Sequence, residues 1–324
     1  MKLRHLFAAT AITLCAGPVA AQNFQLSHNA AAGNPKAVAS ERFAELVSEK
    51  SDGRLNIDVG GAAQFGDDSE TLTNMRLGTV AFSANSQGAT SAIVPEMALL
   101  GLPFLFQDLD QAEAVMDGPV GDKIEAAAEV QGLVVLAWWN NGIREVSNSR
   151  GPINTPADLA GMKIRTPPDP MTIDIFTALG ASPTPMAFSE LYIALQQGVV
   201  DGQENPLINI HSSKLYEVQP YISMTAHKYE STPLLASKII MDTMSPEDQQ
   251  IIREAAAEAA ELNRQMVREQ TVSLKNEMEN AGVAFNEVDT APFIEATQPV
   301  YEKWRAQFPE LLEEVVAAAQ AASQ

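Results

Sequence analysis

Residues 23–61 read "NFQLSHNAAAGNPKAVASERFAELVSEKSDGRLNIDVGG", and this stretch decides the fold class of the chain. It predicts a strand, a loop, a helix and a second strand in that order. Asn34 can cap a helix that begins with Pro35 and stops before Gly53, and one face of this helix is apolar, with Ala39, Phe43, Leu46 and Val47. Strand, helix, strand is the alternation from which α/β sheets are built.

The same alternation continues along the chain. A helical stretch over 68–77 leads into "TVAFSAN", and "GLVVLAWW" at 132–139 is an apolar run typical of a buried parallel strand. Beyond Gly151 the pattern restarts with the strand "GMKIR" at 161–165. Helices in "DPMTIDIFTALG" and "MAFSELYIALQQG" follow, and then the short strand "VVDGQ". The sequence therefore predicts a second α/β unit.

A long helix is predicted from Pro246, with Ser245 as its cap, to about Glu279. At 1.5 Å per residue such a helix is roughly 50 Å long, which is more than the diameter of one domain. It could therefore brace two lobes. Two more helices, near 292–307 and 311–322, end the chain.

The first residues have the pattern of a secretory signal peptide, with a basic start, an apolar run and small residues before a cleavage site. We expect residues 1–21 to be removed, so that the mature chain starts near Gln22. Cys15 raises the alternative of a lipoprotein, but Leu14 stands before it where a small residue is expected. Since Cys15 is the only cysteine, cleavage after Ala21 leaves none and excludes disulfides and thiol catalysis.

The charge balance is acidic. The whole chain carries a formal net charge of −20, and removal of Lys2 and Arg4 with the signal peptide makes the mature chain more negative still. Such a surface disfavours binding to nucleic acid and to anionic membranes. If the ligand is an acid, its attraction to this protein must be local.

The residues that catalysis or metal binding would need are scarce. Beyond the signal peptide the histidines are His28, His211 and His227, and none has the spacing of a helical zinc pair. The sequence contains no Walker loop, no Rossmann glycine fingerprint and no nucleophile elbow. We therefore expect no catalytic residue, no metal and no cofactor.

Two arginines at predicted strand ends are more informative. Arg165 ends "GMKIR", and the carboxyl ends of strands are where α/β sheets bind ligands. Arg144, in "NNGIREVSNS", follows another strand. Two guanidinium groups that converge on one carboxylate would give bidentate recognition that lysine cannot copy. Two surface arginines in ordinary salt bridges remain the alternative.

The motifs "NNGIREVSNS", "GMKIRTP", "GASPTPMAFSELYIALQQGVVDGQENP" and "KLYEVQPYISMTAH" resemble the periplasmic solute-binding proteins of tripartite ATP-independent periplasmic (TRAP) transporters, the DctP family. The likeness covers essentially the whole mature chain. It implies a type II-like periplasmic binding protein, not an enzyme, with two α/β lobes joined by hinge strands and a long lobe-spanning helix. Lobe I would comprise 22–141 plus 231–270, and lobe II 142–230 plus 271–324. The resemblance also implies a monomer that delivers an organic acid to a membrane permease.

The resemblance assigns candidate site residues by position. Arg165 matches the main carboxylate-binding arginine of the family, and Asn205 in "QENP" matches the amide that contacts the same carboxylate. Arg144 matches the arginine of the "NGxR" stretch, and Phe188 matches an aromatic residue that packs against the ligand. Glu204 is expected to be a structural acid rather than a ligand contact.

In the first lobe, Asn29, Asp68 and Asn85 fall where the family contacts the rest of the ligand. Several neutral polar residues near predicted strand ends suit a polyhydroxylated acid, namely Asn29, Asn85, Gln87, Asn140 and Asn141. The predicted ligand is therefore a hexuronate or aldonate, such as glucuronate, galacturonate or gluconate. Sialic acid and a C4-dicarboxylate remain alternatives. The latter would need a second cationic site, and no further lysine or arginine stands out in a matching loop. A secreted carbohydrate-active enzyme is the alternative from another class.

Overall fold

The computed structural model describes residues 21–323. Except for Ala21, the predicted signal peptide over 1–21 lies outside the described residues. Within the described range, no helix combines the length and the apolar character that a membrane crossing requires.

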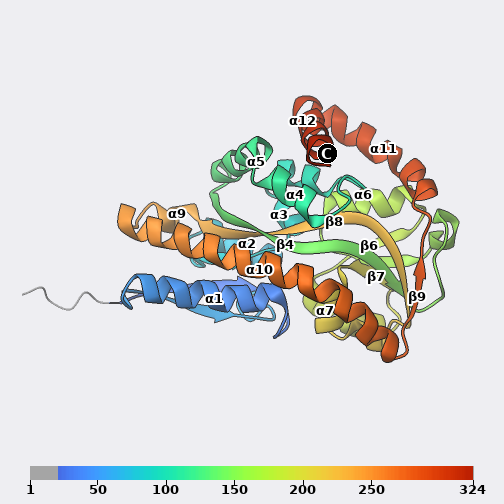
Figure 1. Ribbon diagram of the computed structural model, residues 1–324, viewed down its shortest axis with the longest axis horizontal. Coiled ribbons are helices and arrows are strands. Elements are labelled where there is room, and N and C mark those ends of the chain that lie inside the picture. Colours follow the sequence, from blue (N-terminus) through green and yellow to red (C-terminus); the bar gives the residue numbers. More distant parts are fainter. Residues whose placement is uncertain (1–20, 324) are drawn as a thin grey trace, which may run out of the picture.

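The described strands form one sheet (Figure 1). Its order is β2-β1-β3-β8-β4-β7-β5-β6, and β9 pairs with β8 beside this path. The strands are β1 (Gln22–His28), β2 (Leu55–Gly60), β3 (Phe82–Ala84), β4 (Leu133–Asn148), β5 (Lys163–Thr166), β6 (Ser182–Pro185), β7 (Gly202–Asn205), β8 (Tyr221–Ser237) and β9 (Ala284–Glu287).

Two long antiparallel strands, β4 and β8, divide this sheet into two lobes (Figure 1). In lobe I, the second half of β8 pairs with β3, which continues to β1 and β2. In lobe II, the second half of β4 pairs with β7, and the first half of β8 pairs with β9. The β4–β8 register shifts between Asn140 and Gly142, where Gly142 has a φ of 126°. Only glycine adopts such a backbone readily, so this position is suited to a hinge.

The two-lobed α/β architecture with hinge strands is therefore confirmed, whereas the boundaries at 141/142 and 230/231 stay a prediction. One expectation about the sheet was wrong. Residues 133–139 of this apolar run lie in β4, which is antiparallel to both β8 and β7 rather than parallel to its neighbours. A strand that is buried on both faces is apolar whether its neighbours run parallel or antiparallel to it. An apolar run alone therefore does not reveal the direction of the neighbouring strands.

The helices cover both faces of the sheet (Figure 1). They are α1 (Pro35–Lys50), α2 (Asp68–Arg76), α3 (Gln87–Ser91), α4 (Leu109–Met116), α5 (Pro119–Val130), α6 (Pro170–Ala178), α7 (Phe188–Gln196), α8 (Leu207–Ser212), α9 (Lys238–Met241), α10 (Pro246–Asn280), α11 (Ala291–Gln307) and α12 (Pro309–Ala322). Short 3-10 helices lie at η1 (Pro95–Gly101), η2 (Pro156–Leu159) and η3 (Leu215–Glu217).

The long helix α10 spans the molecule, as predicted (Figure 1). Its cap forms as the sequence indicates, because Ser245 Oγ accepts the backbone N–H of Asp248 at 3.1 Å. It packs on α1 in lobe I and on α8 in lobe II. The C-terminal helices also reach both lobes, since α11 packs on α6 and α12 packs on α4 and α5. The segment 271–324, expected in lobe II, thus contacts helices of lobe I as well.

Candidate functional site

A cavity of about 280 Å³ lies between the lobes. Lobe I contributes the residues after β1 and the starts of α1 and α2, while lobe II contributes the ends of β5 and β7 and the start of α7. The carboxyl ends of β1, β5 and β7 thus meet at one place, as expected for the ligand site of an α/β sheet. Six of the seven predicted site residues line this cavity, namely Asn29, Asp68, Arg144, Arg165, Phe188 and Asn205.

Arg165 is a buried cation whose charge is not neutralised by a contacting acid. Its Nε and Nη2 donate to the carbonyl oxygen of Met186 at 3.1 and 2.8 Å, and its guanidinium carbon lies 5.7 Å from the centre of the Phe188 ring. No carboxylate in the described range lies within 4.0 Å of it. Burial lowers the pKa of Arg165 to about 10, although the charge of Glu204 partly opposes this shift. A ligand carboxylate would supply the missing negative charge.

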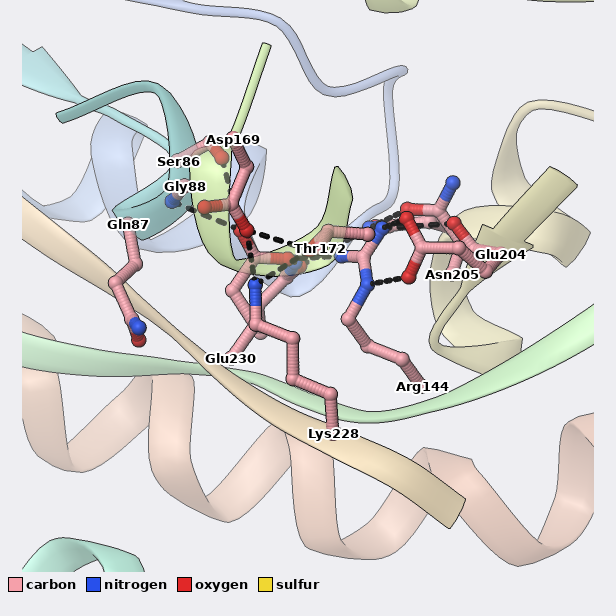
Figure 2. Close-up of polar contacts among 12 residues, drawn as sticks. Ser86, Gln87, Gly88, Arg144, Asp169, Thr172, Glu204, Asn205, Lys228 and Glu230 are labelled. Carbon is pink, nitrogen blue, oxygen red and sulfur yellow. Dashed lines mark hydrogen bonds and ion pairs between the residues drawn. The ribbon is translucent and has the colours of Figure 1, made fainter. Parts of the chain in front are cut away.

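Arg144 differs from Arg165 because acids already occupy its donors (Figure 2). Its Nε contacts Glu204 Oε2, its Nη1 contacts Glu230 Oε2, and its Nη2 donates to Glu204 Oε1 at 2.7 Å. Burial disfavours ionisation of Glu230, but the charges of Arg144 and Lys228 and the hydrogen bonds from Ser86 and Gly88 together outweigh burial and lower the pKa of Glu230 to about 2. Arg144 therefore joins β4, β7 and β8 as a buried ion pair, and the contact with ligand assigned to it stays a prediction.

Glu230 also connects this cluster to lobe I (Figure 2). Its Oε1 accepts the hydroxyl of Ser86 at 2.9 Å and the backbone N–H of Gly88 at 3.2 Å, both from the start of α3. Beside it, Lys228 on β8 contacts Asp169 at the start of α6. Buried charges in both lobes thus converge where the hinge strands pass behind the cavity.

Asn205 is held by a chain of amides. Its Nδ2 donates to Gln203 Oε1 at 2.5 Å, and its Oδ1 accepts from Asn209 Nδ2 at 3.1 Å. Asn209 also donates to Asn141 Oδ1 at 3.0 Å and accepts from Asn34 Nδ2 at 2.9 Å. Because Asn34 caps α1 in lobe I and Asn209 lies on α8 in lobe II, this chain joins the two lobes at the cavity.

The lobe I wall contains a cation that the sequence analysis missed. Lys36, in the first turn of α1, lines the cavity and is only 4% exposed. Its Nζ donates to Asn29 Oδ1 at 3.2 Å, and Asn29 Nδ2 donates to Asp68 Oδ2 at 2.7 Å. The expectation that lobe I offers no further cation was therefore wrong. The one signal available was its position at the start of the helix that follows β1, since the loop after a strand of an α/β sheet leads past the ligand site.

Asn85 lies behind the cavity wall rather than in it. Its Nδ2 donates to the backbone oxygen of Asp68 at 3.1 Å and to Ser83 Oγ at 3.2 Å. The buried amide therefore supports the start of α2 beneath Asp68. Asn85 is not among the residues that line the cavity, and the direct ligand contact assigned to it stays a prediction.

Metal ligands do not cluster anywhere in the described chain, because no group of three or more His, Cys, Asp or Glu side chains converges on one point in residues 21–323. The interlobe cavity is lined by charged and amide side chains from both lobes. Two α/β lobes that enclose a cavity with a buried, uncompensated guanidinium define a solute-binding protein of the two-lobed class.

The chain belongs to the bacterial extracellular solute-binding proteins of family 7, DctP, which it matches over residues 26–307. This confirms the resemblance found in the sequence, and members of the family are extracytoplasmic solute-binding proteins rather than enzymes.

Individual relatives agree with this assignment. The chain is 36% identical over 301 residues to the 2,3-diketo-L-gulonate-binding periplasmic protein YiaO of Escherichia coli, covering 91% of this chain and 92% of YiaO. It is 50% identical over 303 residues to the uncharacterised protein y4mM of Sinorhizobium fredii, covering 93% of this chain but only 56% of y4mM. The crystal structure of the sugar acid binding protein DctPAm of Advenella mimigardefordensis with galactonate superposes with a TM-score of 0.91, at 33% identity, and the match covers 94% of this chain and 99% of that one.

Proposed function

We propose that this protein captures a carboxylate-bearing sugar acid in the periplasm and, as a monomer, delivers it to the membrane permease subunits of a TRAP transporter. The ligand class is a hexuronate or aldonate, such as glucuronate, galacturonate or gluconate. The observation that carries this proposal is Arg165, a buried guanidinium that lines the interlobe cavity without a contacting acid. A buried charge without a partner is costly, so the site favours a ligand that brings a carboxylate.

The polar character of the remaining wall supports a hydroxylated acid. Asn29, Lys36, Asp68 and Asn141 line the cavity in addition to the arginine site. Ligand hydroxyls that leave water need hydrogen-bond partners of this kind. An apolar acid would leave these polar side chains of the wall without partners. A volume of about 280 Å³ suits a small molecule rather than a polymer. The ligands named for YiaO and DctPAm, a diketogulonate and galactonate, belong to the same chemical class.

Binding and transport require hinge closure. In this mechanism the carboxylate docks on Arg165 and Asn205 in lobe II, and lobe I then closes over the hydroxyl groups. Closure excludes water, so the charge-assisted hydrogen bonds strengthen. The amide chain from Asn34 through Asn209 to Asn205 supports this view, because it connects the lobes through the residue proposed to hold the carboxylate.

A thermal-shift screen of the mature protein tests the proposal. The panel comprises hexuronates, aldonates, sialic acid, C4-dicarboxylates and 2-keto acids, and a selective rise in melting temperature with a sugar acid is expected. A rise with succinate or malate alone would overturn the ligand class but keep the transport role. Incubation with uronate oligomers is expected to give no bond cleavage, and cleavage would favour the enzyme alternative.

A further inference from the structure

Lys36 has donors that point to a ligand. An ammonium carries three N–H groups, and the protein supplies one acceptor in the described range, Asn29 Oδ1 at 3.2 Å. No carboxylate among residues 21–323 lies within 4.0 Å of Lys36. The side chain is nevertheless buried in the cavity wall. Since an unpaired buried donor is costly, the remaining N–H groups of Lys36 are available for ligand oxygens.

Asp68 offers the complementary acceptor. Its Oδ2 accepts the Asn29 amide at 2.7 Å, while its Oδ1 accepts no hydrogen bond from the described residues. Asp68 lines the same cavity as Lys36. Asn29 therefore bridges the two side chains, because it donates to the carboxylate and accepts from the ammonium. The wall presents a free acceptor beside free donors.

Helix starts fix both groups in place. Asn34 Oδ1 accepts the backbone N–H of Lys36 at 2.9 Å and so caps α1. Asp67 caps α2 in the same way, through the backbone N–H of Glu70 at 3.0 Å, and Asp68 is the first residue of that helix. The positive end of the helix dipole also favours an ionised carboxylate at this position. The two groups are thus presented rigidly to the cavity.

We propose that Lys36 and Asp68 form a subsite that binds neighbouring hydroxyl groups of the ligand and rejects a second carboxylate. This inference rests on the proposed function, in which Arg165 holds the first carboxylate. A hydroxyl both donates and accepts, so a vicinal diol satisfies Asp68 and Lys36 together. A second carboxylate only accepts. It would satisfy Lys36 but would leave Asp68 Oδ1 without a donor and place two negative charges side by side.

The subsite therefore restricts the expected ligands to a narrower chemical class than the cavity as a whole does. Lys36 supplies the second cation that a dicarboxylate would need, and Asp68 removes that advantage. The ligand expected is a monocarboxylate with an intact diol remote from its acid group, as in an aldonate or a uronate. An aldarate of the same chain length, with a carboxylate at each end, is expected to bind less tightly.

The test compares two aldonates with their aldarates, D-galactonate with galactarate and D-gluconate with glucarate, by titration calorimetry. Burial raises the pKa of Asp68 to about 6, so titrations at pH 8 keep its carboxylate ionised. Wild-type protein is expected to prefer the aldonate. Asp68→Asn, which is close to isosteric, is expected to weaken aldonate binding and strengthen aldarate binding, each at least tenfold. Lys36→Met is expected to weaken the aldonate at least tenfold.

Asp58→Asn is a matched control, because Asp58 is an exposed acid on β2 outside the cavity wall. It removes one negative charge and is expected to leave both dissociation constants unchanged. The inference would be overturned if the ratio of the aldonate and aldarate dissociation constants in Asp68→Asn stayed within twofold of the wild-type ratio. Unchanged aldonate binding by Lys36→Met would also overturn it. If wild-type protein binds aldarates as tightly as aldonates, the inference also fails while the sugar-acid function stands. A wild-type protein that binds no sugar acid overturns the proposed function and the inference together.

Discussion

Substitution of Arg165 by methionine should strongly weaken ligand binding and change the stability of the empty protein much less. In the empty site, burial lowers the pKa of Arg165 from 12.5 to about 10, which corresponds to a cost of about 3 kcal/mol for holding the charge there. The hydrogen bonds to Met186 O return roughly 2 kcal/mol. These terms nearly cancel, so the free energy of unfolding of Arg165→Met should lie within about 2 kcal/mol of wild type.

Binding should respond far more strongly. A carboxylate held by two charge-assisted hydrogen bonds gains about 3 to 6 kcal/mol, so the dissociation constant should rise by roughly 10² to 10⁴. Arg165→Lys keeps the charge but loses the planar fork, and an intermediate loss is expected. Titration calorimetry measures the affinity and urea unfolding measures the stability. Arg150→Met is the matched control, because Arg150 is an exposed arginine paired with Asp201.

Unchanged affinity in Arg165→Met would refute the assignment of the carboxylate site. A loss of more than about 4 kcal/mol of stability in the empty variant would refute the reasoning in another way. Arg165 would then be a structural cation, and its buried charge would be compensated by the protein itself rather than by a ligand.

Three further predictions concern the lobes and their hinge. Arg144→Met should lower the free energy of unfolding by about 3 to 5 kcal/mol in urea, since it leaves Glu204 and Glu230 buried without their partner, and a loss below 1 kcal/mol would contradict the buried ion pair. Asn34→Ser keeps a cap for α1 but removes the amide donor to lobe II, so stopped-flow measurements should show ligand dissociation roughly tenfold faster; an unchanged rate would exclude this amide from closure. Burial raises the pKa of Glu145 from 4.5 to about 8, so the folded protein keeps a proton that the unfolded chain loses, and wild-type stability should fall as the pH rises through this window. The loss of stability between pH 5 and pH 9, measured by urea unfolding, should be about 3 to 5 kcal/mol smaller in Glu145→Gln than in wild type. Parallel stability-versus-pH profiles of the variant and the wild type would rule out the raised pKa of Glu145.

Much of the fold could be predicted because local patterns determine it. The apolar face and cap of α1 and the long periodic stripe of α10 follow from helix geometry, which needs no knowledge of the tertiary structure. Strand β8 could not be predicted in this way. Its buried side chains include Lys228 and Glu230, whose partners come from distant segments, and Pro233 also argues against a central strand. The burial of such residues becomes favourable only when the partners are in place.

The candidate site could likewise be predicted only where a local pattern points to it. Arg165 was found because it ends a strand, and strand ends meet at one edge of an α/β sheet. Lys36 was missed because a lysine in the first turn of a helix normally faces solvent, and its burial in the cavity wall depends on the tertiary structure. The acids around Arg144 were not foreseen as a group either, because Glu204 and Glu230 lie far apart in the sequence.

The paired strands β4 and β8 also constrain the order in which this chain can fold. Lobe I remains incomplete until β8 arrives, since β3 pairs with β8 through residues as distant in sequence as Phe82 and Ala236. Such nonlocal pairing closes long loops and slows folding. Neither lobe is a continuous piece of chain, so neither should fold when expressed alone. The same crossing that permits the hinge therefore makes the protein a single folding unit.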